Sequence, residues 1–566
     1  MSTPKTGGQI VVDLLRSVGV THVFGVVGGQ TLAITDAILA TPGIELVHTR
    51  HEGAAAVMMD AYGRLTGRPA ACIATTGPGA TNLITGVGGA FRDSSPGFVL
   101  TCNNNGENIH KDDAQNADHV ELFRPLTKYS RLVAHASSLK QAVEEAYINA
   151  VTGNPGPVHL DFARDTIEGV VENPPVVPEV HPALSWVGVK PAPDAVALAE
   201  VAERVLAAER PVIWLGNGGN RSGAGTDVLA LAHSLNIPVV TTFNGIGSVP
   251  TTDPLVFGAV SRMGTQISTR VLDDADLVLA LGNSLNAVST TRWKRSLPAV
   301  VQVDVDPTMI GRYYAEVTTG VVSDLGSFSR GLLDAVGSAA AAAKEGRAGW
   351  VAGLQDAETE WWRSVEVRDA SPTGTLSPAD VVRALREVAP DDTLLIPDAG
   401  NPGVWSFLWE IRQQGSYIKP VGFGNMGFAL PSAIAASVID PERPVLALIG
   451  DGSLGMSLGE LETLARVGGR VCVVVLNDAS YGNIRQEQEL HFGGRTIGVD
   501  FGHVDFGVVA TGMGVTGEVV SDLDVLCKRV ADVLSGNGPA LIDVPLDRDA
   551  NAWTFPAFSP YEAGEE

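Results

Sequence analysis

The chain contains one segment whose succession of strand, turn, helix and strand constrains the fold more than any other feature. Residues 445–449 are an apolar run typical of a buried strand in a parallel sheet, and the run ends at a Gly-Asp-Gly turn centred on Asp451. Residues 457–466 carry apolar side chains at helical spacing, and residues 471–476 form a second apolar run that ends at Asn477. The segment predicts an open α/β sheet with Asp451 and Asn477 at strand ends, where such sheets bind ligands.

The residue types at these strand ends indicate the kind of ligand. Asp451 and Asn477 both offer an oxygen atom to a hard cation, and Mg²⁺ takes oxygen ligands and shares them with phosphate groups. Gly450 and Gly452 let backbone N–H groups and the start of a helix approach a phosphate. We therefore expect a magnesium and phosphate site. The alternative is an ordinary turn in which Asp451 caps the following helix.

A second motif lies near the N-terminus. A predicted strand at 45–48 is followed by Arg50, His51 and Glu52, and then by an alanine-rich helix. An acidic residue is favourable in the first turn of any helix, so Glu52 alone leaves a structural role open. Together with the turn at Asp451, Glu52 is a candidate site residue.

The same alternation of strands and helices recurs in three blocks, so the expected fold class is α/β with three doubly wound parallel-sheet domains. The expected domains are residues 1–170, 190–338 and 374–546, followed by a tail at 547–566. Predicted linkers are a Pro-rich stretch at 170–195, and 339–374 with its helical part and a Ser-Pro-Thr-Gly turn. Further predicted strands are 22–26, 70–75, 157–162, 211–215, 238–241, 277–281 and 300–305, and predicted helices are 8–18, 32–39 and 54–66.

Composition excludes several classes of partner. The chain has 566 residues and a formal net charge of −25. A protein this acidic is not expected to offer the basic surface that binds nucleic acid or an anionic membrane. No apolar stretch reaches membrane-spanning length, and the N-terminus has no apolar signal core. The four cysteines show no pair spacing, so we expect free thiols in a reducing compartment and a cytoplasmic protein.

Motifs along nearly the whole chain resemble one enzyme family. They are FGVVGG, RHEGAAAVMMDAYGRLTG, TTGPGATNLITGV, NPGPVHLDF, VQVDVDP and GFGNMGFALPSAIAAS. The chain resembles the acetohydroxyacid synthase, pyruvate oxidase and oxalyl-CoA decarboxylase branch of thiamine diphosphate (ThDP) enzymes. The resemblance implies pyrimidine-binding, middle and diphosphate-binding domains, with ThDP and Mg²⁺ as cofactors. It also implies a homodimer or homotetramer whose active sites lie between the first domain of one subunit and the third of another.

The resemblance assigns roles to residues of the metal and diphosphate site. Asp451 and Asn477 are the implied side-chain ligands of Mg²⁺, and Ala479 supplies a backbone carbonyl. Gly452 and Ser453 are expected to donate to the diphosphate.

The remaining implied cofactor contacts lie in both end domains. The Gly424 carbonyl is expected to hold the aminopyrimidine, and Met426 to bend the cofactor, although Met426 would also suit a gap in the core. Glu52 is expected at the pyrimidine N1′, where its carboxyl promotes proton exchange. Further residues expected around ThDP are Gly28, Gln30, Asn401, Gly450, Tyr481 and Gly482.

Departures from better-known family patterns guide the choice of substrate. The first domain lacks the His-His pair of simple 2-oxoacid decarboxylases, and residues 282–286 are Gly-Asn-Ser-Leu-Asn where acetohydroxyacid synthases have Arg-Phe-Asp-Asp-Arg. That segment is similar to the Gly-Ala-Arg-Leu-Asn of oxalyl-CoA decarboxylases and 2-hydroxyacyl-CoA lyases. Arg292, Lys294 and Arg295 follow it, and they suit either the phosphates of coenzyme A or a solvated helix edge.

The main prediction is a ThDP-dependent 2-hydroxyacyl-CoA lyase that releases formyl-CoA and an aldehyde or ketone. Gln115 and Glu487 are the expected reaction-centre residues, with Glu489 and Gln30 as alternatives. The alternative function is an acetolactate synthase-like or benzoylformate decarboxylase-like enzyme acting on a free 2-oxoacid. Oxalyl-CoA decarboxylase ranks lower because residues 483–487 depart from its pattern.

Further alternatives concern the activity, the middle domain and the tail. One is a catalytically silent ThDP-binding subunit, and Glu52 argues against it because binding alone would not need this carboxyl. The glycine-rich turn at 216–220 is weak support for a flavin, ADP or CoA nucleotide in the middle domain. The tail aromatics Trp553, Phe555 and Phe558 suit either a lid over the substrate or a subunit contact.

Overall fold

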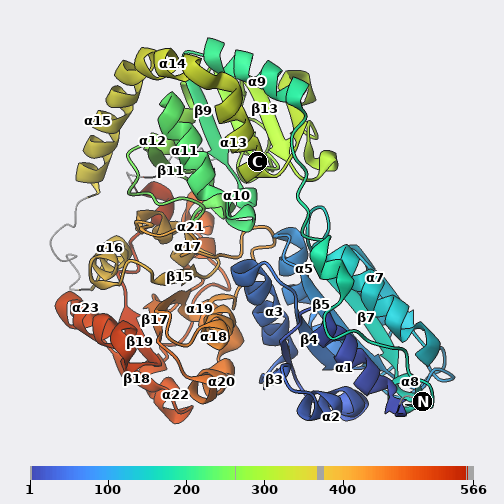
Figure 1. The fold of residues 1–566 in the computed structure, drawn as a ribbon. Coiled ribbons are helices and arrows are strands. Elements are labelled where there is room, and N and C mark those ends of the chain that lie inside the picture. The colour runs from blue at the N-terminus through green and yellow to red at the C-terminus, as the bar shows by residue number, and fades with distance from the viewer. Residues whose placement is uncertain (1–2, 262, 366–374, 556–557, 559–566) are drawn as a thin grey trace.

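The computed structural model describes residues 3–261, 263–365, 375–555 and 558. The structure contains three parallel β-sheets, each covered by helices, which confirms the expected α/β class with three doubly wound parallel sheets. Figure 1 shows the three sheets as separate lobes, which we call the first (blue to cyan), middle (green to yellow) and third (orange to red) lobes.

The first lobe has six parallel strands in the order β3-β2-β4-β5-β7-β6. The strands are β2 (His22–Gly25), β3 (Glu45–His48), β4 (Ala70–Thr75), β5 (Gly97–Asn103), β6 (Ser130–Val133) and β7 (Pro157–Ala163). The helices are α1 (Gly7–Ser17), α2 (Leu32–Ala40), α3 (Glu52–Thr66), α4 (Pro78–Asn82), α5 (Ile84–Arg92), α6 (His119–Phe123), α7 (Leu139–Val151) and α8 (Arg164–Glu168). The strand order reverses between β2 and β4, and such a switch point is a preferred ligand site.

The middle lobe has the order β11-β10-β9-β12-β13-β14, with its switch point between β9 and β12. The strands are β9 (Pro211–Leu215), β10 (Val239–Thr242), β11 (Val256–Val260), β12 (Leu277–Leu281), β13 (Ala299–Asp304) and β14 (Thr318–Val322). The helices are α9 (Ala195–Ala207), α10 (Asn217–Ser222), α11 (Gly225–Leu235), α12 (Gln266–Asp273), α13 (Leu325–Val336), α14 (Ala340–Gly346) and α15 (Ala348–Ser364).

The third lobe has five parallel strands in the order β15-β16-β17-β19-β18. The strands are β15 (Leu394–Pro397), β16 (Val445–Gly450), β17 (Val471–Asn477), β18 (Thr516–Val519) and β19 (Ala540–Pro545). The helices are α16 (Pro378–Val388), α17 (Asn401–Trp405), α18 (Ala429–Ile439), α19 (Asp451–Ser457), α20 (Glu460–Val467), α21 (Gly482–His491), α22 (Phe506–Gly512) and α23 (Leu523–Asp532).

The helix predicted at 457–466 has the wrong bounds. α19 begins directly at Asp451, and α20 follows after a break at Leu458 and Gly459. Glycine is a weak helix former, and a Cβ on Gly459 would lie 3.3 Å from Arg50 Cβ of the first lobe. The break therefore lies where another lobe approaches the backbone closely.

Both predicted linkers contain more structure than their composition suggests. β8 (Val170–Val171) pairs antiparallel with β1 (Lys5–Thr6) at the edge of the first lobe. Arg347, between α14 and α15, is buried and donates to the carbonyls of Leu235 and Ala208 at 2.8 and 3.0 Å. The helical stretch is thus packed on the middle lobe, while the predicted Ser-Pro-Thr-Gly turn lies outside the described residues.

The third lobe shares hydrophobic core with both of the others. One buried cluster joins it to the middle lobe, and a second joins it to the first lobe through α3, α5 and α18. Asp93 stands where all three meet, because it accepts from Arg64 of its own lobe, Asn244 of the middle lobe and the Gly422 backbone, at 2.7–2.8 Å. The three sheets therefore form one packed unit.

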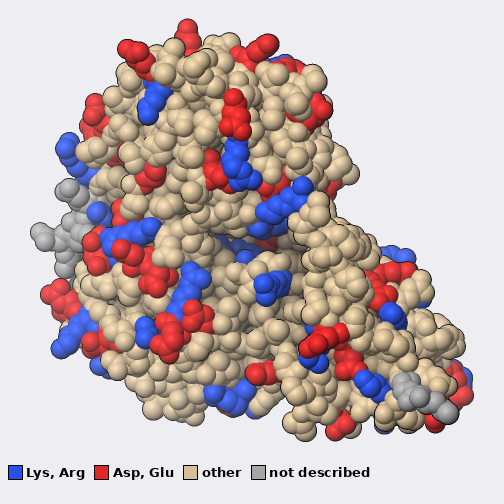
Figure 2. All heavy atoms as spheres, viewed as in Figure 1, with Lys and Arg blue, Asp and Glu red and all other residues tan. Residues whose placement is uncertain are grey.

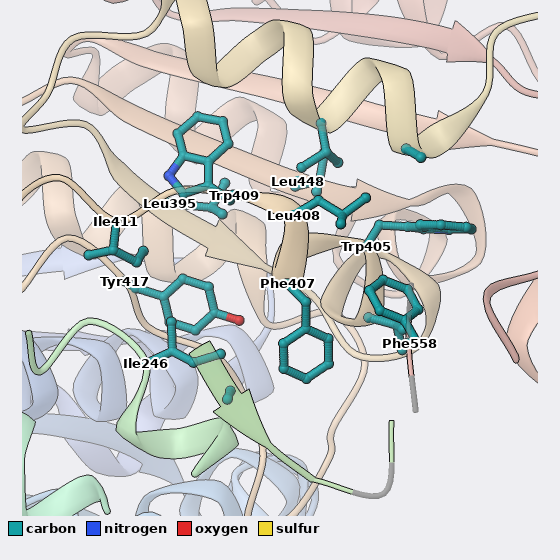
Figure 3. Close-up of a cluster of buried hydrophobic side chains, with 14 of the residues drawn as sticks. Ile246, Leu395, Trp405, Phe407, Leu408, Trp409, Ile411, Tyr417, Leu448 and Phe558 are labelled. Carbon is teal, nitrogen blue, oxygen red and sulfur yellow. The ribbon is translucent and has the colours of Figure 1, made fainter. Parts of the chain in front are cut away.

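The tail packs against the third lobe with its aromatic side chains. Phe555 contacts Trp405 edge-on with ring centroids 5.1 Å apart, and Phe558 lies 5.8 Å from Trp405 and 5.9 Å from Phe407. Figure 3 shows Phe558 beside these two rings at the edge of the buried cluster. Gln266 of the middle lobe donates to the Phe558 carbonyl at 3.2 Å, so the tail also bridges two lobes.

The surface carries charges of both signs despite the net charge of −25. Figure 2 shows acidic and basic side chains interspersed on one face, with basic side chains bordering the hollow at its centre. Among the helices in the described part of the chain, none has the length and apolar content needed to cross a bilayer. All four cysteines are free thiols, three of them buried and Cys527 half-buried.

Candidate active site

A cavity of about 240 Å³ opens at the carboxyl ends of β15, β16 and β17. The turn after each of these strands contributes to it, as do the loop before α18 and the start of the tail. The lining residues are Pro378, Ala399, Gly400, Asn401, Pro402, Trp405, Gly424, Met426, Gly450, Asp451, Gly452, Ser453, Leu476, Asp478, Ser480, Tyr481, Gly482, Asn483, Ile484, Leu546, Asp547 and Ala550. The cavity thus gathers most of the third-lobe residues that the sequence singled out.

Asp451 is the principal acidic group of the cavity. It is buried at the first position of α19, and its burial, together with the nearby charge of Asp478, raises its pKa to about 7. A carboxylate that is desolvated beside a second carboxylate is stabilised by a cation. This pair therefore favours a positive ligand in the cavity.

Asn477 is oriented by groups behind the cavity. Its Nδ2 donates to Asp543 Oδ1 at 2.9 Å and to the Val504 carbonyl at 3.3 Å, while its Oδ1 accepts from the Ala479 N–H at 3.2 Å. Asp543 is fully buried and also accepts from the Phe506 N–H at 3.0 Å. These bonds fix which end of the Asn477 amide is the oxygen, as outer-shell partners of metal ligands commonly do.

The donor atoms in this region fit Mg²⁺. Asp451 offers a carboxylate, Asn477 an amide oxygen, and Ala479 a carbonyl on a backbone turned by a positive φ of 53°. Mg²⁺ takes oxygen ligands and completes its shell with water or phosphate. Within the described residues no group of three or more His, Cys, Asp or Glu forms a metal site. A cation here would therefore depend on the Asp451 carboxylate together with the neutral oxygens of Asn477 and Ala479, two residues that are not among those lining the cavity.

The turn beside Asp451 needs glycine because an aromatic ring lies against it. A Cβ on Gly452 would lie 2.7 Å from the Tyr481 ring, which packs edge-on against Phe501 with centroids 4.5 Å apart. The backbone N–H groups of Gly452 and Ser453 lie in the first turn of α19, where no intrahelical acceptor exists for them. They therefore suit an anion in the cavity, although the Gly452 N–H is shared with the Asp451 carboxyl, whose pKa it lowers.

Asp398 supports the loop that carries Gly424 and Met426. It is fully buried and accepts from the backbone N–H groups of Gly427 and Ala429 at 3.1 and 2.7 Å. Burial raises the pKa of Asp398 to about 6. The loop is thus held from behind, and both Gly424 and Met426 line the cavity.

Sequence analysis missed Gln486, which links the cavity to the tail. Its Oε1 accepts from Asn401 Nδ2 and from the Ala552 N–H, both at 3.3 Å, and its Nε2 donates to the Ala550 carbonyl at 3.0 Å. Asn483 completes the chain of amides by donating to Asn401 Oδ1 at 3.0 Å. Gln486 is next to the predicted Glu487 in a run of similar polar residues, and only the structure shows that Gln486 is the buried one.

Glu487 and Glu489 are not among the residues that line the cavity. Glu489 pairs with Arg485 at 2.8 Å one helical turn away, and Glu487 lies one turn beyond the lining residues of α21. Asp478, which sequence analysis did not select, lines the cavity instead.

Glu52 begins α3 at the edge of the first lobe. Its Oε2 accepts from Asn82 Nδ2 at 2.9 Å, whereas no hydrogen bond to its Oε1 is found among the described residues. The backbone N–H groups of Arg50 and His51 both donate to Glu460 Oε1 of the third lobe at 3.0 Å. The segment that presents Glu52 is therefore fixed by a buried carboxylate of another lobe.

Gly28, Gln30 and Gln115 gather at the same edge of the first lobe. Gln30 Oε1 accepts from Thr75 Oγ1 at 2.5 Å, and a Cβ on Gly28 would contact the same threonine. Gln115 is exposed with a φ of 60°, and its carbonyl accepts from Thr76 Oγ1 at 3.2 Å. Neither these residues nor Glu52 line the third-lobe cavity, so one chain presents two separate groups of site residues.

The basic residues of the middle lobe are not equivalent. Arg295 is mostly buried and forms an ion pair with Asp273, whereas Arg292 and Lys294 are exposed. Trp293 packs against Tyr313 with ring centroids 4.7 Å apart.

The glycine-rich turn at 216–220 makes a backbone contact across the middle-lobe switch point. The Gly218 N–H donates to the Gly282 carbonyl at 3.0 Å, and a Cβ on Gly218 would lie 2.5 Å from Gly282 Cα. Close packing between β9 and β12 therefore accounts for these glycines.

Three family descriptions match successive parts of the chain. They are the thiamine pyrophosphate enzyme N-terminal TPP binding domain at residues 5–122, the central domain at 198–332 and the C-terminal TPP binding domain at 398–544. Each match contains most of one of the three sheets. The chain is therefore a ThDP-dependent enzyme with N-terminal, central and C-terminal domains.

Curated relatives narrow the family. The chain is 30% identical to the mitochondrial acetolactate synthase catalytic subunit of Aspergillus candidus, over 96% of this chain and 81% of the relative. It is 30% identical to a probable acetolactate synthase large subunit of Methanocaldococcus jannaschii, over 96% and 92%. It is 28% identical to the acetolactate synthase isozyme 1 large subunit of Escherichia coli, over 99% and 97%. The chain belongs to the acetolactate synthase family of ThDP enzymes.

Proposed function

We propose that this protein uses ThDP and Mg²⁺ to make or break a carbon–carbon bond next to the carbonyl of a free 2-oxoacid, as an acetolactate synthase-like enzyme. The observation that carries the proposal is the likeness to acetolactate synthases over nearly the whole chain, combined with a cavity that gathers Asp451, Gly452, Ser453 and Met426. The free 2-oxoacid, which ranked second on sequence grounds, thereby ranks above a CoA thioester.

Each chemical requirement of this reaction would be met by named groups of the chain. Asp451, Asn477 and the Ala479 carbonyl would hold Mg²⁺, and the Gly452 and Ser453 N–H groups would hold the diphosphate. When bound, ThDP supplies the electron sink for the substrate carbon. Glu52, with Oε2 held by Asn82, would exchange a proton at its free Oε1.

We also propose that a second copy of the chain completes the site. The third-lobe cavity is lined without any first-lobe residue, so Glu52 from the same chain does not face it. Phe423, Met456 and Ile484 are each about half exposed on the third lobe, and exposed apolar side chains of this kind mark protein interfaces. A symmetric homodimer, or a homotetramer built from it, would bring Glu52 of one copy to Asp451 of the other.

The second candidate is a 2-hydroxyacyl-CoA lyase. Arg292 and Lys294 are exposed beside the Trp293–Tyr313 pair, a combination that suits the phosphates and base of a CoA nucleotide. Arg295 contributes less to this hypothesis because its side chain is mostly buried.

Product analysis separates the two candidates. The purified protein with ThDP and Mg²⁺ is incubated with pyruvate, with benzoylformate or with 2-hydroxyacyl-CoA thioesters, and products are identified by liquid chromatography and mass spectrometry. We expect the wild-type protein to release acetolactate or carbon dioxide from a free 2-oxoacid. The Glu52→Gln variant should release neither product from the same substrate. Formyl-CoA from the thioesters, without turnover of the free acids, would overturn the proposal in favour of the lyase.

A further inference from the structure

A buried polar network between β5 and β7 of the first lobe has no role in the chemistry described so far. At its centre is Asp161 of β7, which is 1% exposed. Asp161 Oδ1 accepts from Thr101 Oγ1 at 2.6 Å and from His119 Nδ1 at 2.9 Å, and Oδ2 accepts from Asn103 Nδ2 at 2.7 Å. Thr101 and Asn103 lie on β5, so alternate residues of two neighbouring strands supply this network on one face of the sheet.

The hydrogen bonds define the protonation of His119. Its Nε2 lies 3.0 Å from the backbone nitrogen of Gly77, and a backbone N–H can only donate. Nε2 is therefore the unprotonated acceptor, and Nδ1 carries the proton that is donated to Asp161. Although burial opposes ionisation, the hydrogen bond from His119 and the neighbouring imidazoles hold the pKa of Asp161 below its usual value. A charged Asp161 makes Nε2 a stronger acceptor for Gly77.

A second histidine on the other side of Asp161 does not contact this turn. Thr101 must donate its only hydroxyl proton to the carboxylate, so it accepts from His159 Nε2 at 2.8 Å. His159 Nδ1 then accepts from Ser130 Oγ at 2.8 Å. His119 and His159 are both buried; His119 bonds Asp161 directly, whereas His159 reaches it through Thr101, and of the two only His119 contacts Gly77.

The turn that His119 holds carries two groups of the candidate site. Gly77 has a φ of 65° and immediately precedes α4, whose last residue, Asn82, donates to Glu52 Oε2. Thr76 donates to the carbonyl of Gln115. A single backbone turn therefore connects the buried network with both first-lobe candidates for the reaction centre.

We propose that His119, polarised by Asp161, is a positioning residue that fixes the Thr76–Gly77 turn and thereby the contact of Asn82 with Glu52. The catalytic consequence rests on the proposed function, because it assumes that Glu52 acts on the cofactor. The structural part, in which His119 holds the turn, does not depend on any substrate.

Two substitutions separate the two bonds of His119. His119→Gln extends as far as the ε position and keeps an acceptor for Gly77. His119→Asn reaches only the δ position, so it keeps a donor for Asp161 and leaves the Gly77 N–H unpaired. His159→Asn is the matched control, because it disturbs the same carboxylate network without touching the turn.

The first readout is amide hydrogen exchange of residues 76–82 in the cofactor-free protein, followed by mass spectrometry. We expect faster exchange there in His119→Asn, and near wild-type exchange in His119→Gln and His159→Asn. Equal exchange in His119→Asn and His159→Asn would overturn the proposal. If His119→Asn does not fold, the isosteric Asp161→Asn takes its place, and unchanged exchange at 76–82 would overturn the proposal equally.

The second readout is turnover of the loaded protein. We expect His119→Asn to lower kcat by up to about 100-fold with little change in KM, since a small misplacement of a reacting group has effects of this size. His159→Asn should leave kcat close to wild type even where it lowers Tm. If exchange at 76–82 is altered in His119→Asn but the wild-type protein turns over no 2-oxoacid, only the proposed function is contradicted. If the wild-type protein turns over substrate but exchange in His119→Asn is unaltered, only the positioning role is contradicted.

Discussion

Buried carboxylates in the two halves of the candidate site have opposite surroundings. In the third lobe, Asp451 is desolvated beside Asp478, and its pKa is raised to about 7. In the first lobe, Asp161 accepts three hydrogen bonds from side chains, and its pKa is lowered. A carboxylate whose burial and like-charged neighbour outweigh its hydrogen bonds favours a cation, whereas one with enough donors fixes the surrounding structure. The third lobe thus supplies a binding site, and the first lobe a rigid support.

The largest effect is expected for Asp451→Asn, which removes the uncompensated charge. We expect Mg²⁺-dependent ThDP binding to be lost, because one anionic ligand is removed. The folded pKa near 7 lies above the ordinary value of 3.8, so the stability of the cofactor-free protein falls as pH rises between these values. Asp451→Asn should abolish that fall and raise Tm at pH 8.

Tryptophan fluorescence titration with ThDP and Mg²⁺, and thermal unfolding at pH 5.5 and 8, test both parts. In the wild type, Mg²⁺ affinity should weaken as pH falls below about 7, because the proton competes for Asp451. A cofactor-free variant that is less stable than wild type at pH 8 would contradict the assignment of an uncompensated charge.

The next largest effect is expected for Glu52→Gln. The variant should keep ThDP binding and lose roughly 10²–10⁴-fold in turnover, the usual contribution of a general acid–base group. Glu487→Gln is the control, because Glu487 does not line the cavity and should tolerate the change. Steady-state kinetics at saturating cofactor provide the measurement, and equal losses in both variants would favour the reaction-centre role predicted for Glu487.

Asp161→Ala tests the support in the first lobe. Removing the carboxylate leaves the buried donors of Thr101, Asn103 and His119 without an acceptor, which costs about 1–3 kcal/mol for each group left unpaired. Glu168, seven positions along, pairs with Arg164 on the surface, and Glu168→Ala should cost at most about 1 kcal/mol. Guanidinium unfolding followed by circular dichroism compares the two, and similar midpoints would show that the Asp161 network contributes little.

A smaller effect is expected in the pH dependence of stability. Burial lowers the pKa of His159 to about 3 from its ordinary 6.5. Between these values the unfolded chain binds a proton that the folded protein excludes, so stability falls as pH drops below about 6.5. His159→Gln should reduce this slope by up to about 1.4 kcal/mol per pH unit between pH 6 and 4. An unchanged slope would mean that His159 is protonated in the folded protein.

The smallest effect is expected for the double variant Arg292→Ala and Lys294→Ala. Both side chains are exposed and lie in the middle lobe, away from the residues that line the cavity. Turnover of a 2-oxoacid should therefore be unchanged, as is usual for surface substitutions. A raised KM for a CoA thioester would instead support the second candidate function.

Local signals in the sequence were sufficient for the turn at Asp451 and for several strands. The predicted strands 45–48, 70–75, 211–215 and 277–281 coincide with β3, β4, β9 and β12. The last three are apolar runs bounded by turn residues, which is the pattern of a buried strand. The break at Leu458 and Gly459 was not predictable in the same way. It lies where Arg50, which is remote in the sequence, approaches Gly459 closely.

By itself, the sequence determined the α/β class, the family, and the residue types at the ends of β16 and β17, because periodicity and short motifs are local properties of the chain. Only the tertiary structure decided which buried polar groups meet. His119, Asp161 and Gly77 come from three separate segments. Nothing in the local sequence marks Asp161 as the centre of a network, because its partners Thr101 and Asn103 come close only when β5 pairs with β7. Hydrogen bonds between distant segments form only where the sheet places their donors and acceptors within about 3 Å of each other.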